Sequence, residues 1–322
     1  MATDGTILVA GDTLIDFLPD QPGPPHEAGG YTPNFGGSAA NVALGLDRLG
    51  VSPLFWTRLA DDDFGGFLRE HLYASSIPKT YLIRDQEART TLAVVSHDAN
   101  GDRSFTFYRD GGADTRMLAG TIPDSTLADT AWVHTTGVTL SVEPSRSATL
   151  DLQERATEPT TVSLDPNWRP EMWHSRQEYA AVIRGALGNV DVVKATEDDL
   201  APAGFDTEDR RELIEAVAAL GPHTVILTLG SEGAVCFGSE QSPIPGFVQH
   251  SGYEVETVDS TGAGDVFLAG FIASMTSGVR DPERLLGLAN AAGAVATTKP
   301  GAVSALTGLE EIRNFHNEIP WE

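Results

Sequence analysis

The segment best suited to chemistry is DSTGAGDVFLAGF, residues 259–271. Gly262, Ala263 and Gly264 are small enough for the backbone to approach a ligand closely. A predicted helix begins directly after them, and the free N–H groups at a helix N-terminus favour an anion such as a phosphate. Asp265 lies at the same end, where a carboxylate is able to accept the proton of a hydroxyl that attacks the phosphate. The alternative is that Asp265 only caps the helix.

Two further carboxylates follow the first predicted strand, residues 6–10. Asp12 and Asp16 come after its carboxyl end, the edge at which ligands bind in sheets of parallel strands. A carboxylate there is able to accept two sugar hydroxyls. Either residue could instead belong to a turn.

Two motifs together resemble the ribokinase-like (PfkB) carbohydrate kinases. The first is the Asp-Ser-Thr-Gly-Ala-Gly-Asp segment that ends at Asp265, in which the family has Thr at the position of Ser260. The second is Gly-Gly-Ser-Ala-Ala-Asn-Val-Ala, residues 36–43, followed by Leu49 and Gly50. Their order and separation match the family, and the resemblance covers nearly the whole chain, residues 7–306.

The resemblance implies phosphoryl transfer from ATP to a sugar hydroxyl. Asp265 would be the general base, and the backbone N–H groups of residues 262–264 would form the anion hole. Such groups suit this reaction, which depends mainly on positioning and charge stabilisation. The positions that bind the sugar in this family correspond here to Asp12, Asp16, Gly36, Gly37 and Asn41. Asn41 could instead be a packing residue inside its helix.

Two kinds of metal ion are also implied by the resemblance. Mg²⁺ would bridge the phosphates of the nucleotide. A monovalent cation such as K⁺ would lie near the anion hole. Its carbonyl ligands would come from around Asp259, Thr261, Ala296, Lys299 and Gly301.

A third segment resembles fructokinases and 2-keto-3-deoxygluconate kinases in particular. It is Asp-Pro-Asn-Trp-Arg, residues 165–169, and it assigns Asp165 and Asn167 to the sugar. Because a guanidinium binds oxyanions bidentately, Arg169 is the candidate partner of the phosphoryl group. Residues 89–93 and 101–109 resemble the lid strands of the same enzymes, and they add Arg89, Phe107 and Arg109 to the sugar site. The alternatives are surface ion pairs for Arg109 and Arg169 and simple packing for Phe107.

The nucleotide side rests on shorter matches. Thr228, Gly230 and Gly233 resemble the strand-to-loop segment beside the nucleotide, and Asn290 matches a position near the adenine. Relatives usually carry Asn-x-x-Glu where this chain has Thr196 and Asp199. Lys194 and Thr196, in the same segment, are further candidates for contact with the nucleotide. Asp199 keeps a carboxylate that could orient the water shell of Mg²⁺, although it is one carbon shorter. An acidic run that caps a helix is the alternative.

Short apolar runs alternate with helical patterns along the chain, which predicts a three-layer α/β/α domain with a mostly parallel sheet. We expect one ribokinase-like domain over residues 1–322, with a small β lid from about residues 12–34 and 86–110. Two elements have distinct end signals: a helix that begins at Ser38 as N-cap, and a helix capped by Thr207. Strands are predicted at 6–10, 54–57, 91–95, 103–108, 131–134, 161–164, 190–193 and 224–229, with late helices at 266–275 and 282–298.

Composition narrows the classes of partner. The chain has 46 acidic and 21 basic residues and a net charge of −25, and its lysines are Lys79, Lys194 and Lys299. This balance disfavours nucleic acids and anionic membranes as partners. We interpret the lysine-poor acidic surface as an adaptation to a salt-rich cytoplasm, with an ordinary acidic enzyme as the alternative. The sequence shows neither a signal peptide nor a membrane-spanning run, so a cytoplasmic location is expected.

The preferred hypothesis is an ATP-dependent fructokinase that acts as a homodimer. A 2-keto-3-deoxygluconate kinase is the first alternative, and a non-catalytic sugar-binding protein of the same fold is the second. A P-loop kinase is excluded because the chain lacks Gly-x-x-x-x-Gly-Lys-Ser/Thr. A dinucleotide-binding oxidoreductase is disfavoured because Phe267 stands where its third glycine would be.

Overall fold

The computed structural model describes residues 5–21, 23–97, 103–207, 209–301, 308–316 and 318–320. Its centre is a nine-stranded sheet with the order β13-β12-β11-β10-β9-β8-β1-β4-β5. Neighbouring strands are parallel except where β12 pairs antiparallel with β11 and β13. The strands are β1 (Thr6–Ala10), β4 (Leu54–Ala60), β5 (Leu82–Asp85), β8 (Thr130–Thr136), β9 (Thr161–Asp165), β10 (Val192–Ala195), β11 (Thr224–Thr228), β12 (Ala234–Gly238) and β13 (Gly246–His250).

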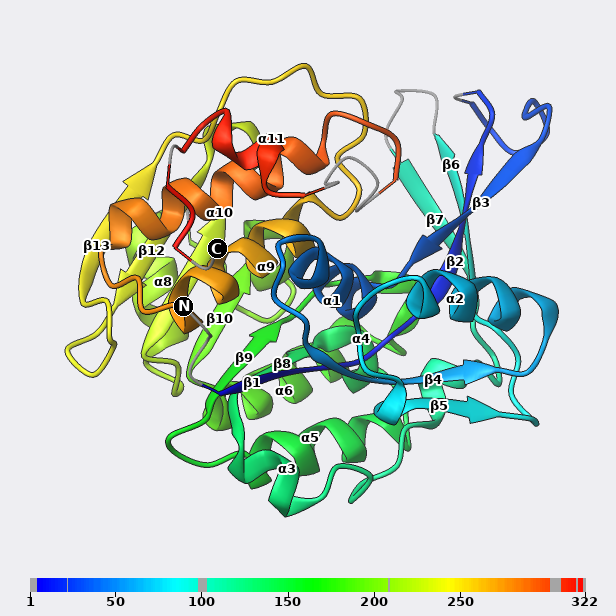
Figure 1. Ribbon diagram of the computed structural model, residues 1–322, viewed down its shortest axis with the longest axis horizontal. Coiled ribbons are helices and arrows are strands. Elements are labelled where there is room, and N and C mark those ends of the chain that lie inside the picture. The colour runs from blue at the N-terminus through cyan, green and yellow to red at the C-terminus, as the bar shows by residue number, and fades with distance from the viewer. Residues whose placement is uncertain are drawn as a thin grey trace.

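Helices cover both faces of this sheet, as the predicted fold class requires (Figure 1). β1 shows why: Ile7 and Val9 pack into one apolar cluster, and Leu8 and Ala10 into the other, because successive side chains of a strand point to opposite faces. The first cluster joins α1, α2, α9 and α10, and the second joins α3, α5, α6 and α8. The helices are α1 (Ser38–Arg48), α2 (Asp63–Tyr73), α3 (Asp124–Ala128), α4 (Gly137–Leu140), α5 (Ser145–Arg155), α6 (Arg176–Ala186), α7 (Glu197–Leu200), α8 (Arg210–Ala218), α9 (Ala263–Thr276), α10 (Pro282–Ala296) and α11 (Glu310–Arg313).

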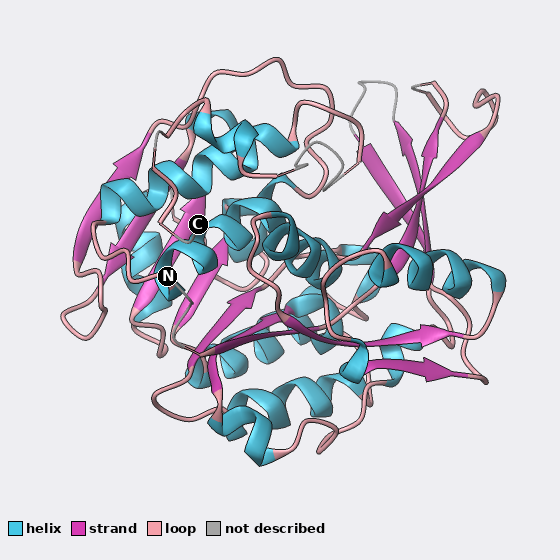
Figure 2. Ribbon diagram, viewed as in Figure 1, coloured by secondary structure: helices cyan, strands magenta, loops and turns pink. Residues whose placement is uncertain are grey.

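A second sheet stands apart from the first at the upper right of Figure 1, and Figure 2 shows its strands clear of the helices. Its order is β3-β2-β6-β7, with β2 (Leu14–Pro19), β3 (Tyr31–Gly36), β6 (Leu92–His97) and β7 (Arg103–Tyr108). The two sequence segments expected to lie together, near residues 12–34 and 86–110, therefore supply this sheet. Residues 98–102, between β6 and β7, lie outside the described residues.

Three predictions about element ends were wrong. The N-cap of α1 is Gly37, and Ser38 is the first helical residue. The N-cap of α8 is Asp209, whose carboxylate accepts from the backbone N–H groups of Arg211 and Glu212, so Thr207 is not the cap. The strand expected at 190–193 is displaced by two residues, since β10 runs from Val192 to Ala195.

Candidate active site

Asp265 lies in the first turn of α9, where the structure buries its carboxylate. The helix begins at Gly262, whose φ of 70° is a left-handed conformation that glycine adopts without strain. One carboxylate oxygen, Oδ1, accepts a hydrogen bond of 2.8 Å from the Ser38 hydroxyl. The other, Oδ2, accepts one of 2.8 Å from the Asn41 side-chain amide. The two donors come from the first turn of α1, so two sequence-distant helix N-termini meet at this carboxylate.

Burial raises the pKa of Asp265 to about 7, although the nearby Lys194 ammonium and the two hydrogen bonds oppose this rise. A carboxylate whose pKa lies near neutrality is well matched to general-base chemistry, because a substantial fraction is ionised near pH 7 and that form takes up a proton readily. The geometry at Asp265 thus fits the role that the sequence predicted for it.

Lys194 lies on the other side of this carboxylate, at the carboxyl end of β10. Its buried ammonium donates a hydrogen bond of 2.8 Å to Asp165 Oδ2, at the carboxyl end of β9. A Cβ at Gly264 would lie 2.7 Å from Lys194 Nζ, so the glycine leaves room for the ammonium beside the start of α9. Because of its carboxylate neighbours, the pKa of Lys194 is raised despite burial. The positive charge lies where an anion would approach the helix.

Asn167 is held by the same network. Its backbone N–H donates to Asp165 Oδ1 at 3.1 Å, and its side-chain amide donates to Ser38 Oγ at 3.1 Å. Its φ of 42° is a left-handed conformation that asparagine tolerates better than most residues. The predicted site residues Asp165, Asn167, Lys194, Asn41 and Asp265 are therefore brought together.

Asp16 lies on the sugar side predicted from sequence. A Cβ at Gly36 would overlap the Asp16 carboxylate, so glycine at this position is what makes room for the carboxylate. Burial and the neighbouring Asp12 raise the pKa of Asp16 to about 7, whereas the Arg169 guanidinium lowers it. Asp265 also contributes to this rise, which places the two carboxylates within reach of each other's charge.

Asp12 has a structural task that the sequence analysis did not foresee. Its carboxylate accepts hydrogen bonds from Ser38 N at 2.7 Å, Ala39 N at 3.4 Å and Thr136 Oγ1 at 3.0 Å. It therefore caps α1 from the end of β1, and it is only 1% exposed. Gly37, with a φ of 108°, allows the close approach, since a Cβ there would lie 2.6 Å from the Asp12 carbonyl oxygen. A sugar contact by Asp12 remains a prediction.

Arg169 and the two phenylalanines of β7 connect the second sheet to the loop after β9. The Arg169 guanidinium lies over the Phe105 ring at 5.9 Å, and Phe105 stacks on Phe107 with ring centroids 5.9 Å apart. One guanidinium nitrogen also donates to the Trp168 carbonyl at 2.7 Å. The ring of Phe107 is half-buried against this stack.

Arg109 and Arg89 are not placed with Asp265. Arg109 donates to Asp114 Oδ2 at 2.7 Å, to Ser141 Oγ at 2.6 Å and to the Val138 carbonyl at 3.0 Å. These three bonds hold the guanidinium in place, and its charge still acts on the Asp12 carboxylate, whose pKa it lowers. A contact between Arg109 and the sugar remains a prediction. Arg89 has an exposed side chain, and its backbone bridges to Gly112.

On the nucleotide side, Thr196 and Asp199 form a capping box at the start of α7. Asp199 Oδ2 accepts from Thr196 N and Oγ1, and Asp199 Oδ1 accepts from Trp168 N at 2.7 Å. Asp199 thus performs the capping task of the alternative interpretation. A role of its carboxylate toward the water shell of Mg²⁺ remains a prediction. The described residues contain no cluster of three or more His, Cys, Asp or Glu side chains suited to a metal ion.

The other nucleotide candidates lie on three elements. Thr228, at the end of β11, donates to the Ala195 carbonyl at 3.3 Å. Gly230 and Gly233 flank the short turn after it with φ values of 59° and 86°, and a Cβ at Gly233 would overlap the His250 carbonyl. Asn290 lies on α10, where its side-chain amide donates to the Leu286 carbonyl at 2.8 Å.

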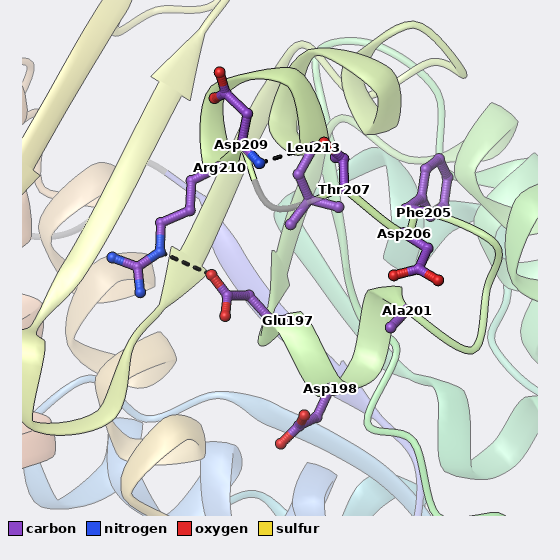
Figure 3. Close-up of a pocket in the computed structure, with 9 residues that line it drawn as sticks. All are labelled: Glu197, Asp198, Ala201, Phe205, Asp206, Thr207, Asp209, Arg210 and Leu213. Atoms are coloured by element: carbon purple, nitrogen blue, oxygen red, sulfur yellow. Dashed lines mark hydrogen bonds and ion pairs between the residues drawn. The ribbon is translucent and has the colours of Figure 1, made fainter.

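A solvent-accessible cavity of about 910 Å³ lies between α7 and α8 (Figure 3). Acidic side chains predominate in its lining, and Arg210 crosses it to pair with Glu197 at 2.7 Å. None of the groups that bond to Asp265 lines this cavity. The lining residues are Glu197, Asp198, Ala201, Phe205, Asp206, Thr207, Asp209, Arg210 and Leu213.

The segments predicted to hold a monovalent cation are adjacent. Asp259 Oδ1 accepts from Thr261 N at 2.9 Å, and Asp259 Oδ2 accepts from Gly301 N at 3.0 Å. The backbone N–H of Asp259 also donates to the Thr297 carbonyl at 3.0 Å. These bonds join the start of the 259–264 loop to the segment after α10, which contains Lys299. These bonds bring the predicted segments together, and the backbone carbonyls that would bind K⁺ remain a prediction.

Ser38 was not predicted as a functional residue. Its hydroxyl was expected to cap the helix, whereas in the structure it donates to Asp265. The signal that could have revealed it is the spacing of Ser38 and Asn41, which puts both side chains on one face of the helix. Thr136, which bonds to Asp12, was also missed, and it lies at the carboxyl end of β8.

A buried carboxylate of near-neutral pKa, beside an ammonium and a glycine-rich helix N-terminus, defines a site for phosphoryl transfer to a hydroxyl. The chain belongs to the pfkB family of carbohydrate kinases, which matches residues 4–307. It is 34% identical to the fructokinase of Klebsiella pneumoniae over 326 residues, which cover 96% of this chain and 99% of that protein.

Two crystal structures share the fold. One is fructokinase from Xylella fastidiosa with bound ATP, with a TM-score of 0.86, 26% identity and 98% coverage of each chain. The other is a fructokinase double mutant from Vibrio cholerae O395 with fructose, ADP and potassium ion. It has a TM-score of 0.82 and 31% identity, and it covers 98% of this chain and 99% of that one. No helix in the described part of the chain has both the length and the apolar character needed to cross a bilayer.

Proposed function

We propose that this protein is an ATP-dependent fructokinase. The observation that carries the proposal is the placement of Asp265, buried with a pKa near neutrality at the N-terminus of α9. Fructokinases that match along nearly the full chain support fructose as the acceptor. Asp265, Gly262, Ala263 and Gly264 are all present, which disfavours a non-catalytic sugar-binding protein.

In the proposed reaction, the acceptor hydroxyl attacks the γ-phosphorus of ATP. The bond from that phosphorus to its bridging oxygen breaks, ADP leaves, and the hydroxyl proton passes to an Asp265 carboxylate oxygen. The free N–H groups of the first turn of α9 stabilise the negative charge of the transferring group, and the Lys194 ammonium adds a positive charge beside them. Mg²⁺, when bound with ATP, neutralises part of the phosphate charge.

On the sugar side, we assign Asp16 to the acceptor hydroxyls, because Gly36 keeps space for its carboxylate. Arg169 is assigned to the phosphoryl group or the sugar edge, where its charge also acts on Asp16. The second sheet would close over the sugar and exclude water, which competes for the phosphoryl group. The proposal includes this closure and a homodimer in which the lids of two subunits pair. It also includes K⁺ bound beside the 259–264 loop and a cytoplasmic location.

A 2-keto-3-deoxygluconate kinase is the second candidate. Its carboxylated substrate needs a cationic partner, for which Arg109 was the candidate. The bonds from Arg109 to Asp114, Ser141 and Val138 disfavour that role.

A coupled ADP-release assay tests the proposal. Fructose, 2-keto-3-deoxygluconate, ribose and adenosine would be compared with Mg-ATP at high KCl. We expect kcat/KM to be highest for fructose. A preference for the keto-acid would overturn the choice of sugar, and release with none of the acceptors from folded protein would overturn the kinase assignment for these substrates.

A further inference from the structure

Ser38 contacts the proposed base although no sugar-binding or catalytic role has been assigned to it. It is the first residue of α1 and only 8% exposed. Its hydroxyl donates to Asp265 Oδ1 at 2.8 Å and accepts from the Asn167 side-chain amide at 3.1 Å. A hydroxyl has a single hydrogen to donate. Because Asn167 occupies the acceptor side, that hydrogen is directed to Asp265.

A structural explanation for this hydroxyl would be helix capping, and the structure assigns that task to Asp12. The Asp12 carboxylate accepts from the backbone N–H groups of Ser38 and Ala39. The N-cap position itself is Gly37, which has no side chain. The Ser38 hydroxyl is therefore not needed to satisfy the start of α1.

We propose that Ser38 is a positioning residue for Asp265, fixing the plane of its carboxylate and favouring its ionised form. Ser38 and Asn41 each hold one carboxylate oxygen, so the carboxylate cannot rotate without breaking one of the two bonds. Each oxygen keeps a lone pair for the acceptor hydroxyl. The inference rests on the proposed function, in which Asp265 is the base.

Ser38 also links the base to the loop that follows β9. Asn167, its donor, is held by Asp165, whose other oxygen binds Lys194. If sugar binding moves the Asn167 side chain, the Ser38 hydroxyl that it contacts would alter the hydrogen bond to Asp265.

Three charged groups outside α1 and α9 also act on Asp265. Lys194 on β10 stabilises its ionised form, whereas Asp165 on β9 and Asp16 on β2 destabilise it. Substitution of Ser38 leaves these three groups in place, so any change in titration reports the lost hydroxyl.

The test compares Ser38→Ala with Ser38→Thr, which keeps the hydroxyl, and with Ser274→Ala as a matched control. Ser274 is a buried serine farther along α9, and its hydroxyl donates to the Gly270 carbonyl at 2.8 Å. Two readouts are measured on the full-length protein. One is the pH dependence of kcat and kcat/KM for fructose. The other is the carboxyl titration of Asp265 by NMR of ¹³C-aspartate-labelled protein, with the signal assigned by its loss in Asp265→Asn.

For Ser38→Ala we expect kcat to fall about tenfold or more, the loss typical of one hydrogen bond to a charged group. The KM for fructose should change much less. The acid limb of the kcat/KM profile and the NMR titration should both move to higher pH, because the ionised carboxylate loses a donor. Ser38→Thr should restore most of the activity, and Ser274→Ala should leave the titration unmoved.

Folded Ser38→Ala with wild-type kcat and an unmoved titration would overturn the proposal. If Ser38→Ala does not fold, Ser38→Cys gives the answer, because a thiol has similar size but is a weaker donor. An intermediate upward shift then supports the proposal, and no shift overturns it. The NMR titration needs no substrate. A failure of fructose turnover in the wild type would therefore count against the proposed function alone.

Discussion

At the scale of single residues, the site contains two carboxyl groups whose ionisation is made unfavourable by their surroundings. The pKa values of Asp265 and Asp16 are each raised to about 7, chiefly by burial. A group that binds its proton more tightly when folded makes the folded state less stable as pH rises between the unfolded and folded pKa values. Sites of this kind commonly exchange stability for activity.

Asp265→Asn should therefore be more stable than the wild type at pH 8. An aspartate in the unfolded chain titrates near pH 3.9, so the advantage should be absent at pH 4, grow up to about pH 7 and then level off. The raised pKa, which already includes the attraction to Lys194, corresponds to a gain of roughly 4 kcal/mol at pH 8. Urea unfolding at pH 5 and pH 8 measures it. An equal difference at both pH values would contradict the raised pKa of Asp265.

The resemblance of two sequence motifs to the PfkB family placed Asp265, Asn41 and the 262–264 loop in one site, and the structure brings Asn41 and Asp265 into contact. The motifs did not predict the partner of Ser38. That partner lies 227 positions away in the chain, and local pattern made a capping role for Ser38 the simpler interpretation. The partners of Arg109 were not predicted either, because Asp114, Val138 and Ser141 belong to later segments that the sequence pattern did not single out.

At the scale of elements, the start of α1 depends on a residue from another element. Asp12, beyond the end of β1, accepts from two backbone N–H groups of α1 and from Thr136 at the carboxyl end of β8. Asp12 thereby ties a helix N-terminus to two neighbouring strand ends. This N-terminus also carries Ser38 and Asn41, so the cap positions both donors to Asp265.

Asp12→Ala should lower the free energy of unfolding by about 1–3 kcal/mol, because a helix cap and a buried hydrogen-bond acceptor are both lost. Urea denaturation at pH 7 measures this change. Asp16→Ala is the matched control, since it removes a neighbouring carboxylate with a raised pKa and should not destabilise the fold. Equal stability of Asp12→Ala and wild type would show that the cap is dispensable.

The sequence predicted most central strands, but not the strands of the second sheet before residue 37. β3 contains Pro33, and proline normally argues against a strand because it has no N–H for the ladder. β3 lies at the edge of its sheet, where one side of its backbone has no neighbouring strand. The topology that makes proline acceptable there was not visible in the sequence.

At the scale of the whole molecule, the net charge of −25 dominates. Repulsion among exposed carboxylates destabilises the compact state, and salt screens it. Two of the three lysines, Lys79 and Lys299, are exposed, whereas Lys194 is buried in the proposed site. The buried lysine, Lys194, forms a specific ion pair with Asp165.

The melting temperature should therefore rise between 0.1 M and 2 M KCl. Differential scanning calorimetry at pH 7.5 measures it, with NaCl at the same concentrations as the control. A similar rise in both salts indicates screening, and an additional rise in KCl alone supports the K⁺ site near Asp259. A melting temperature that does not change with salt would contradict the interpretation of the acidic surface as an adaptation to salt.

The central claim is that Asp265 is the base of a sugar kinase, and the turnover of Asp265→Asn tests it most directly. We expect kcat with fructose and Mg-ATP to fall by about 10²–10⁴-fold, the usual effect of removing a general base. ATP affinity, measured by calorimetry, should stay within a few fold. Asp129→Asn, which changes an exposed aspartate before β8, should behave as wild type. A kcat for Asp265→Asn within about twofold of wild type would contradict the account.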